Sequence, residues 1–294
     1  MWFAFSAVLI AGSIAALAVF GLKLNIDFVG GSLIEAQFAD QIPSNQELQK
    51  TLETAGFQNA VVQPSGEKKV ILRMETLTED QHQLVLKALG DAYKGIQEDR
   101  FDSIGPVIGK ELRRTSIFGV AITLALIGFY IAWAFRKVTE PVRSWKYGLL
   151  TVLCAFHDVI VPVGVFAVLG YFFHWEVGSA FIAAILTILG YSISDTVVVF
   201  DRTRENLLRR TGESFGETVE KSIRQTYVRS INTSLTTILA LVAIFVLGGE
   251  STRPFSLALL IGIAVGTYSS IFIASPALVA WEAWEAKRSA SRMS

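Results

Sequence analysis

The sequence predicts a polytopic α-helical membrane protein with six transmembrane helices and an external α+β domain between the first and second helices. The chain of 294 residues is 52% hydrophobic and has a mean hydropathy of +0.47. Its apolar residues fall into blocks of about 20, the length of helix that crosses roughly 30 Å of hydrocarbon. Soluble domains do not contain such long apolar runs. Extended polar sequence occurs in one region, after the first block.

Three parts are expected: a first transmembrane helix at residues 1–22, an external domain at 23–114 and a five-helix transmembrane domain at 115–294. The first span lacks the basic start and cleavage site of a signal peptide, which favours a retained anchor with a short cytoplasmic extension before Met1. The other five spans are expected at residues 116–135, 148–173, 179–200, 231–247 and 255–281. In the last of them, a G-x-x-x-G step at residues 262–266 suits close helix packing.

The external region is expected to fold as a ferredoxin-like domain. Two capping boxes start helices after Ser44 and Thr78, and these helices are expected to end near Gly56 and Gly90. Alternating apolar and polar residues predict four strands, at residues 32–38, 60–63, 69–74 and 97–104, with a turn at 64–66. The resulting order, β-α-β-β-α-β, is that of a ferredoxin-like unit. His82 lies on a polar helix face and is predicted to be a solvated surface residue.

Two glycine-bearing junctions bracket this domain. Glycine permits backbone conformations that are closed to other residues, and proline is expected to block helix continuation. The junction residues are Asp27, Gly30, Gly31, Gly105, Pro106 and Gly109. Two interpretations stay open: plain turns, or hinges that let the domain swing against the membrane.

The distribution of Lys and Arg predicts the orientation. The loops at residues 136–147 and 201–229 and the C-terminal segment are basic, whereas the connections at 174–176 and 250–253 hold a single arginine. Basic loops are cytoplasmic, so both termini are expected inside and the ferredoxin-like domain outside. Three basic residues within 110–114 argue the other way, but the alternation of the remaining loops outweighs them.

The longer cytoplasmic loop is expected to contain a helix. Phe215, Val219, Ile223 and Tyr227 repeat every fourth residue and give an apolar stripe beside a charged face. This pattern predicts a helix that lies in the membrane interface and runs into the fifth span.

The candidate functional residues are the ionisable side chains in the spans. They are His157 and Asp158 in the third span, Asp195 in the fourth, and Arg229 at the entry to the fifth. A charge at the centre of a spanning helix costs about 2.5–3.5 kcal/mol on insertion scales, so such groups are paired, hydrated or protonated. A carboxylate in a low-dielectric medium can load and release a proton near neutral pH, which is the chemistry of a proton relay.

Structural roles stay open for each of these residues. Asp195 could be a buried carboxylate bonded to neighbouring helix hydroxyls. His157 and Asp158 are adjacent, so their side chains leave the helix about 100° apart, and both structural pairing and a proton relay are compatible with them. Arg229 could extend to the cytoplasmic interface or pair with Asp195.

Several segments together resemble the SecF family, the smaller partners in SecDF protein-export complexes. The segment GYSISDTVVVFDRTREN at residues 190–206 resembles the family's fourth-span motif. The D-F-x-G-G motif at residues 27–31, the G-P-x-x-G-x-E-L motif at 105–112 and the His-Asp step at 157–158 occur in the family's order. The resemblance therefore covers essentially the whole chain.

The resemblance implies a function that the residues alone do not. Such proteins belong with the resistance-nodulation-division transporters of the bacterial inner membrane, and pair with SecD as a separate or fused chain. Together they use the proton gradient to assist the late, outer-face stage of export of unfolded preproteins through the SecYEG translocon. YidC and YajC are implied as further partners, and nucleic acid is not. In the family, the acid matching Asp195 and the arginine matching Arg229 serve proton transport.

Two other functions are weighed. One is half of a proton-coupled small-molecule efflux transporter, which a single small external domain disfavours. The other is an intramembrane aspartyl protease with Asp158 and Asp195 as its dyad, but the flanking residues are not those expected. The sequence contains no P-loop and no Rossmann fingerprint, and its single cysteine, Cys154, offers no metal site. No enzyme activity and no cofactor are expected, and H⁺ is favoured over Na⁺ as the coupling ion.

Overall fold

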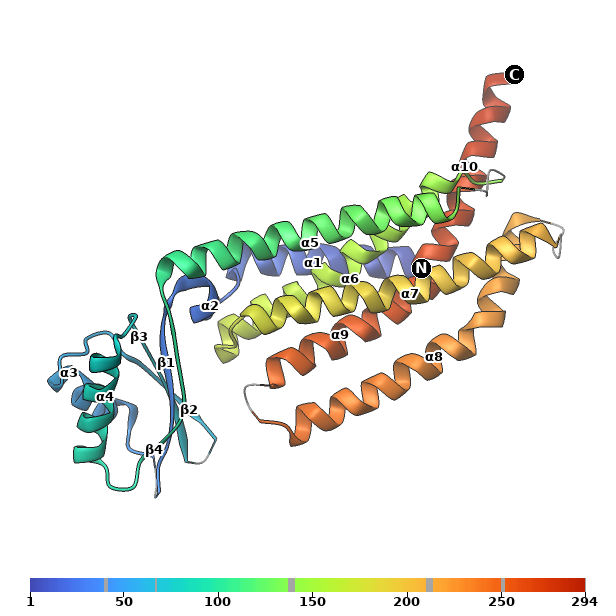
Figure 1. Cartoon of the computed structure of the whole chain (residues 1–294). Helices are drawn as coiled ribbons and strands as arrows, with labels where there is room; N and C mark the ends of the chain where they lie inside the picture. Colours follow the sequence, from blue (N-terminus) through green and yellow to red (C-terminus); the bar gives the residue numbers. More distant parts are fainter. Residues whose placement is uncertain (40–41, 67, 137–140, 210–213, 250–251, 294) are drawn as a thin grey trace. The chain divides into compact units, whose positions relative to one another are not determined.

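The computed structural model describes residues 1–39, 42–66, 68–136, 141–209, 214–249 and 252–293. The chain forms two compact units, one of residues Met1–Lys23 with Phe118–Ser294, and one of residues Leu24–Ile117 (Figure 1). We call them the helical unit and the α+β unit. Residues 137–140 and 210–213, which belong to the two loops assigned to the cytoplasm, lie outside the described residues.

The α+β unit contains the predicted ferredoxin-like domain. Its helices are α2 (Ile26–Val29), α3 (Asn45–Thr54) and α4 (Glu79–Ala92). Its strands are β1 (Gly31–Gln37), β2 (Val61–Ser65), β3 (Lys69–Met74) and β4 (Gln97–Ile104). The sheet is antiparallel in the order β2-β3-β1-β4, the arrangement of a β-α-β-β-α-β unit. The predicted fold class is confirmed.

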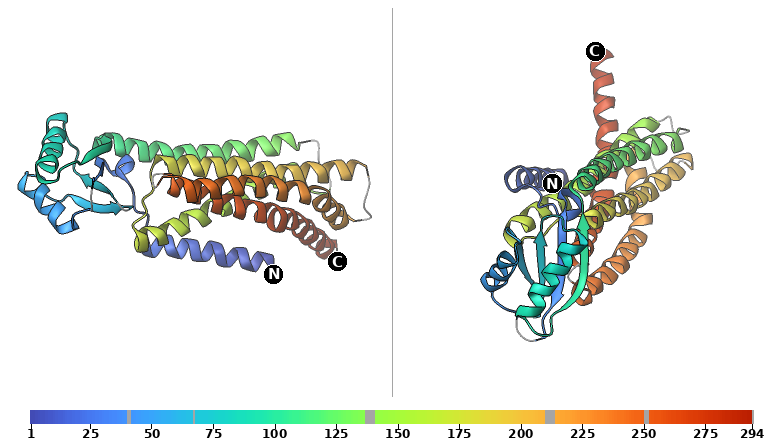
Figure 2. Two further views of the ribbon diagram at one scale, coloured as in Figure 1. Left: turned by 90° about the horizontal axis from the view of Figure 1, so that it is seen from below. Right: turned by 60° about the vertical axis from the view of Figure 1, so that its left-hand side comes forward.

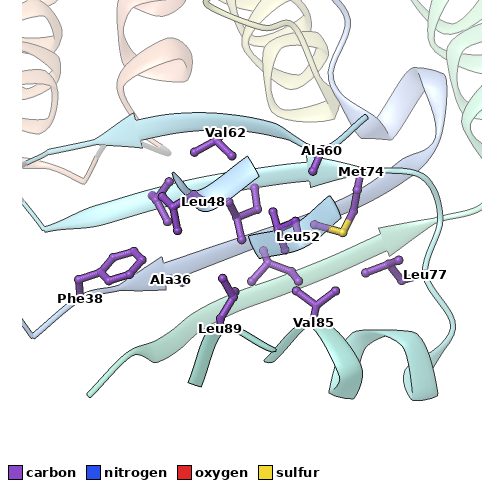
Figure 3. Close-up of a cluster of buried hydrophobic side chains, with 13 residues drawn as sticks. Ala36, Phe38, Leu48, Leu52, Ala60, Val62, Met74, Leu77, Val85 and Leu89 are labelled. Carbon is purple, nitrogen blue, oxygen red and sulfur yellow. The ribbon is translucent and has the colours of Figure 1, made fainter. Parts of the chain in front are cut away.

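The core of this unit lies between the sheet and helices α3 and α4 (Figure 3). Leu48 and Leu52, one helical turn apart on α3, are fully buried against Ile34 and Leu72 of the sheet and Leu89 of α4. Each buried leucine contributes about 1.5–3 kcal/mol relative to an exposed one. Both predicted capping boxes are present at the starts of α3 and α4.

Three details of the α+β unit differ from the prediction. Pro64 belongs to β2 rather than to a turn, which is tolerated because β2 is an edge strand. Helix α4 continues through Gly90 to Ala92. His82 is buried rather than solvated, because α4 packs its ring on Phe101 of β4 with 3.7 Å between ring centroids. Its Nε2 lies 2.9 Å from a carboxylate oxygen of Glu98.

The helical unit holds the remaining long segments. They are α1 (Trp2–Phe20), the C-terminal part of α5 (Pro106–Ala134), α6 (Ser144–Phe173), α7 (Ser179–Leu208), α8 (Phe215–Leu247), α9 (Arg253–Ser269), the π-helical turn η1 (Ser270–Ala274) and α10 (Ser275–Met293). Six helical segments in the described part of the chain are long and apolar enough to cross a membrane, as predicted. Helices α7 and α9 lie side by side, and both contact α6 and α8 (Figures 1 and 2).

Several of the predicted spans are longer in the structure. Helix α5 begins at Pro106, ten residues before the predicted 116, because proline suits the first position of a helix, where its missing N–H costs nothing. Helix α7 continues past Phe200 to Leu208. Helix α8 contains both the predicted loop helix and the fifth span without a break.

Candidate functional site

Asp195 lies half-buried in the middle of α7. Ser230 of α8 donates a hydrogen bond of 2.9 Å to its Oδ1 atom. Its Oδ2 atom is buried and has no hydrogen-bond partner among the described residues. A carboxylate can accept about four hydrogen bonds, so Asp195 has unused capacity at a buried oxygen.

A row of hydroxyl side chains on α8 leads to Asp195. Its members recur every fourth residue and are all buried: Thr218, Ser222, Thr226, Ser230 and Ser234. Residues four apart lie on one helix face, and this face contacts α7 through Ser222, Ser230 and Ser234. Near the start of α8, Asn206 of α7 donates a hydrogen bond of 2.8 Å to Ser222. The α7–α8 contact is therefore polar from the end of α7 to Asp195.

Arg229 immediately precedes the serine that binds Asp195. Its side chain is exposed, and no ion pair joins it to Asp195 in the part of the chain that the structure describes. Consecutive residues of a helix point about 100° apart, and Ser230 is the buried residue of this step. The pairing of Arg229 with Asp195 stays a prediction.

The α7–α8 site adjoins a polar surface on spanning helices. Ser194 of α7 and Arg229, Asn232, Thr233 and Thr236 of α8 are exposed on the single chain. Polar groups in spanning helices are unfavourable against hydrocarbon and face the bundle interior or water. This surface therefore indicates contact with another membrane protein or with a hydrated path.

His157 and Asp158 form a second site in the middle of α6. Asp158 is fully buried, and its Oδ1 lies 2.8 Å from Nδ1 of His157. Its Oδ2 accepts hydrogen bonds from Ser192 of α7 and Ser269 of α9. The two side chains bend toward each other, although adjacent residues leave a helix about 100° apart. Asp158 has three hydrogen-bond partners where Asp195 has one.

The helix geometry changes at the end of α9, next to this second site. The π-helical turn η1 begins at Ser270, directly after the serine that binds Asp158. Ser270 bonds Thr196 of α7 at 2.9 Å and donates to the Ser192 carbonyl at 3.3 Å. π-Helical turns are rare and frequent at functional sites. The sequence analysis missed Ser269 and Ser270, for which the only signal is a Ser-Ser step inside an apolar run.

Small residues let α9 approach α7 beside this site, as the G-x-x-x-G step predicted. A Cβ atom at Gly262 would overlap Ile188, and one at Gly266 would come within 2.9 Å of Cβ of Ser192. This approach puts Ser270 of η1 within hydrogen-bonding reach of Thr196 and Ser192 of α7.

The two carboxylates do not form a dyad. Asp158 is bonded to His157, Ser192 and Ser269, whereas Asp195 is bonded to Ser230. No hydrogen bond joins the two acids within the described residues, and aspartyl proteases require carboxyls that share a proton. Among these residues, no cluster of three or more His, Cys, Asp or Glu side chains could hold a metal ion.

The two glycine-bearing junctions pack against each other inside the α+β unit. Gly30 has φ of +81°, and a Cβ atom there would lie 2.7 Å from Cα of Pro106. A Cβ atom at Gly109 would lie 2.9 Å from the backbone nitrogen of Gly30. These backbones approach too closely for any other residue without a shift. The hinge interpretation of these segments stays a prediction.

Comparisons with known proteins agree on one family. The family described as "Protein export membrane protein SecD/SecF, C-terminal" matches residues 85–284, and the "SecD/SecF GG Motif" matches residues 15–42. The protein translocase subunit SecF of Thermobaculum terrenum is 44% identical over 94% of this chain and 89% of its own. That of Anaerolinea thermophila is 38% identical over 97% of this chain and 92% of its own.

Solved structures add a fused relative. The crystal structure of SecDF from Thermus thermophilus, a translocon-associated membrane protein, has a TM-score of 0.80 and 35% identity, covering 95% of this chain and 37% of that chain. A super-membrane-facing form of SecDF has a TM-score of 0.69 and 34% identity, covering 98% of this chain and 38% of that chain. The chain thus spans somewhat more than a third of these SecDF proteins.

Proposed function

This chain belongs to the SecD/SecF family as a multi-pass membrane subunit of the protein translocase, and we propose that it uses the proton gradient to assist preprotein export from the outer face of the membrane. Asp195 is the proposed protonatable group and Arg229 its proposed partner. The observation that carries this proposal is Oδ2 of Asp195, a buried carboxylate oxygen without a partner in a spanning helix. Such an atom is costly when ionised and unpaired, and protonation or a cation removes the cost.

The hydroxyl row of α8 supports a proton path on one side of Asp195. Hydroxyls both donate and accept hydrogen bonds. Thr218, Ser222 and Thr226 donate to backbone carbonyls one turn back on α8, so the row provides a polar oxygen at each turn between the basic loop and Ser230. With the basic loop on the cytoplasmic side, the row is the proposed route of proton release. Protonation neutralises Asp195 and frees Arg229, and ionisation draws Arg229 back. The repacking of α7 and α8 is the proposed link to movement of the external domain.

The exposed polar surface of α7 and α8 supports a membrane partner. Fused SecDF relatives join a SecD part to a part similar to this chain. We propose that SecD covers the surface around Ser194 and Asn232 and shields the α7–α8 site from lipid. The SecYEG translocon and the unfolded preprotein are the proposed further partners. The efflux alternative has no supporting observation.

The test is the substitution Asp195→Asn, which keeps the shape and removes the titratable group. Preprotein translocation is measured in vesicles from a SecDF-depleted strain that carries the variant and its SecD partner, with and without an imposed proton gradient. The gradient-dependent part of translocation should be lost. Asp201→Asn is the matched control, because Asp201 lies on the same helix, is exposed and pairs with Arg204. If Asp195→Asn retains the gradient-dependent part, the proposal is wrong.

A further inference from the structure

A buried histidine nitrogen without a partner lies beside Asp158. His157 is 2% exposed, and its Nε2 atom is buried and has no hydrogen-bond partner among the described residues. Its Nδ1 atom lies 2.8 Å from Oδ1 of Asp158. An ionised carboxylate only accepts hydrogen bonds, so the hydrogen of the neutral ring resides on Nδ1 and Nε2 keeps a free lone pair.

The bonds around Asp158 fit its ionised form. Ser192 and Ser269 donate to its Oδ2 atom, and Nδ1 of His157 donates to its Oδ1 atom in the tautomer that carries the ring hydrogen on Nδ1. Hydroxyls and a neutral ring compensate a buried negative charge incompletely, and removing a carboxylate from water without a countercharge is strongly unfavourable. Within the described residues, no Lys or Arg forms an ion pair with Asp158. A proton on Nε2 supplies the missing positive charge and makes the pair neutral overall.

We propose that His157 and Asp158 form a second proton-binding site, in which the proton resides on Nε2 of His157 and Asp158 stays ionised. The role of this site in export rests on the proposed proton coupling, whereas proton binding at His157 does not depend on that proposal. Ser192 and Asp195 are three residues apart on α7, so they lie on the same side of one helical turn. The second site is thereby bonded to the turn that carries Asp195.

Uncharged groups of four helices surround the pair. Cys154 lies one turn before Asp158 on α6. From α9, the ring of Tyr268 lies 6.4 Å from the ring of His157, and its hydroxyl is bonded to Ser6 and to the Trp2 carbonyl of α1. Helix α7 contributes Ser192. Asp158 is thus the charged group in contact with His157, and it should govern the proton affinity of the ring.

The test observes the two ring nitrogens directly. The full-length protein is labelled with ¹⁵N-histidine, reconstituted in lipid and studied by solid-state NMR as pH is raised from mildly acidic to mildly alkaline. The chain has three histidines, so the His157 signals are those lost in His157→Gln and retained in His174→Gln and His82→Gln. If His157→Gln does not fold, the other two variants assign the His157 signals by elimination.

The expected result is a proton on Nδ1 throughout and loss of the Nε2 proton as pH rises. Asp158→Asn should weaken proton binding at Nε2 at least about tenfold, the effect of removing an adjacent opposite charge. An Nε2 that keeps one protonation state throughout, or an unchanged affinity in Asp158→Asn, overturns the proposal. The measurement is repeated in Asp195→Asn, where the Nε2 titration should persist. Failure of the export proposal and failure of this one are therefore observed separately.

Discussion

Asp195 and Asp158 are both aspartates in spanning helices, yet their surroundings differ. Asp158 is fully buried among three helices and uses both oxygens, with His157, Ser192 and Ser269 as donors. Asp195 is half-buried between two helices and uses one oxygen, with Ser230 as its donor. Asp158 is enclosed by packed helices, whereas Asp195 lies next to a polar surface.

This difference separates two ways of keeping an acid in a membrane protein. A fully bonded carboxylate is tied to the helices around it, and removing it leaves several polar groups without partners. A partly bonded carboxylate can change its protonation state with few other changes. We therefore expect Asp158 to dominate stability and Asp195 to dominate proton-coupled export.

The largest expected effect on stability follows from Asp158→Ala. It leaves His157 and the Ser192 hydroxyl without an acceptor in the bundle interior, and breaking a buried pair in this way costs about 3–5 kcal/mol. Asp195→Ala removes a single hydrogen bond and should cost about 0.5–1.5 kcal/mol. The free energy of unfolding is measured for both variants in detergent micelles. Equal losses would remove the distinction between the two acids.

An intermediate effect is expected from the serines that bind the two acids. Ser269→Ala should destabilise the protein by about 1–3 kcal/mol, because it leaves a buried carboxylate oxygen less satisfied. Ser230→Ala should cost less stability, about 0.5–1.5 kcal/mol, and should change the proton-gradient dependence of export more. Both are measured by unfolding and by vesicle translocation. Ser194→Ala, at an exposed position of α7, is the control for the unfolding measurement and should stay within about 0.5 kcal/mol. An export defect larger in Ser269→Ala than in Ser230→Ala would mean that Asp158, and not Asp195, dominates proton-coupled export.

The sequence predicts the long-range framework because its signals are repeated over many residues. Apolar runs predict the spans, and capping boxes with alternating strands predict the order of the α+β unit. Helix boundaries and the burial of single side chains depend on contacts between residues that are far apart in the sequence. Pro106 starts α5 instead of ending a helix, and His82 is buried because Phe101 of β4 stacks on it.

The candidate site was predictable as residue types but not as bonds. Charged residues in apolar runs indicate Asp195, Asp158 and His157 from the sequence alone. The hydrogen-bond partners of these side chains depend on how each helix is rotated about its axis, because neighbouring residues of a helix point in different directions. Ser230 rather than Arg229 forms the hydrogen bond to Asp195, and the π-helical turn after Ser269 cannot be read from an apolar run.

The smallest effect is expected outside the membrane, where an acid titrates from water. Glu47 accepts hydrogen bonds from the backbone N–H and hydroxyl of Ser44, at 2.9 and 2.8 Å, and these bonds lower its pKa. A lowered folded-state pKa means that the capping bonds stabilise α3 above the unfolded-state pKa, and that this contribution is lost as pH falls through the folded-state value. Hydrogen exchange at the Ser44 amide should therefore gain protection from acidic toward neutral pH, after correction for intrinsic exchange.

Two controls keep this effect apart from titration of the spanning acids. Glu47→Gln keeps the capping geometry without a titratable group, and should remove the pH dependence at Ser44. The second capping box already uses Gln81, which accepts the Thr78 N–H at 2.9 Å, so the Thr78 amide should respond less to pH. A Ser44 response that persists in Glu47→Gln but disappears in Asp195→Asn would instead mean that the spanning acid controls the α+β unit. That outcome would be direct evidence for coupling between the two units, and it would assign the acid sensitivity of α3 to Asp195 rather than to its own cap.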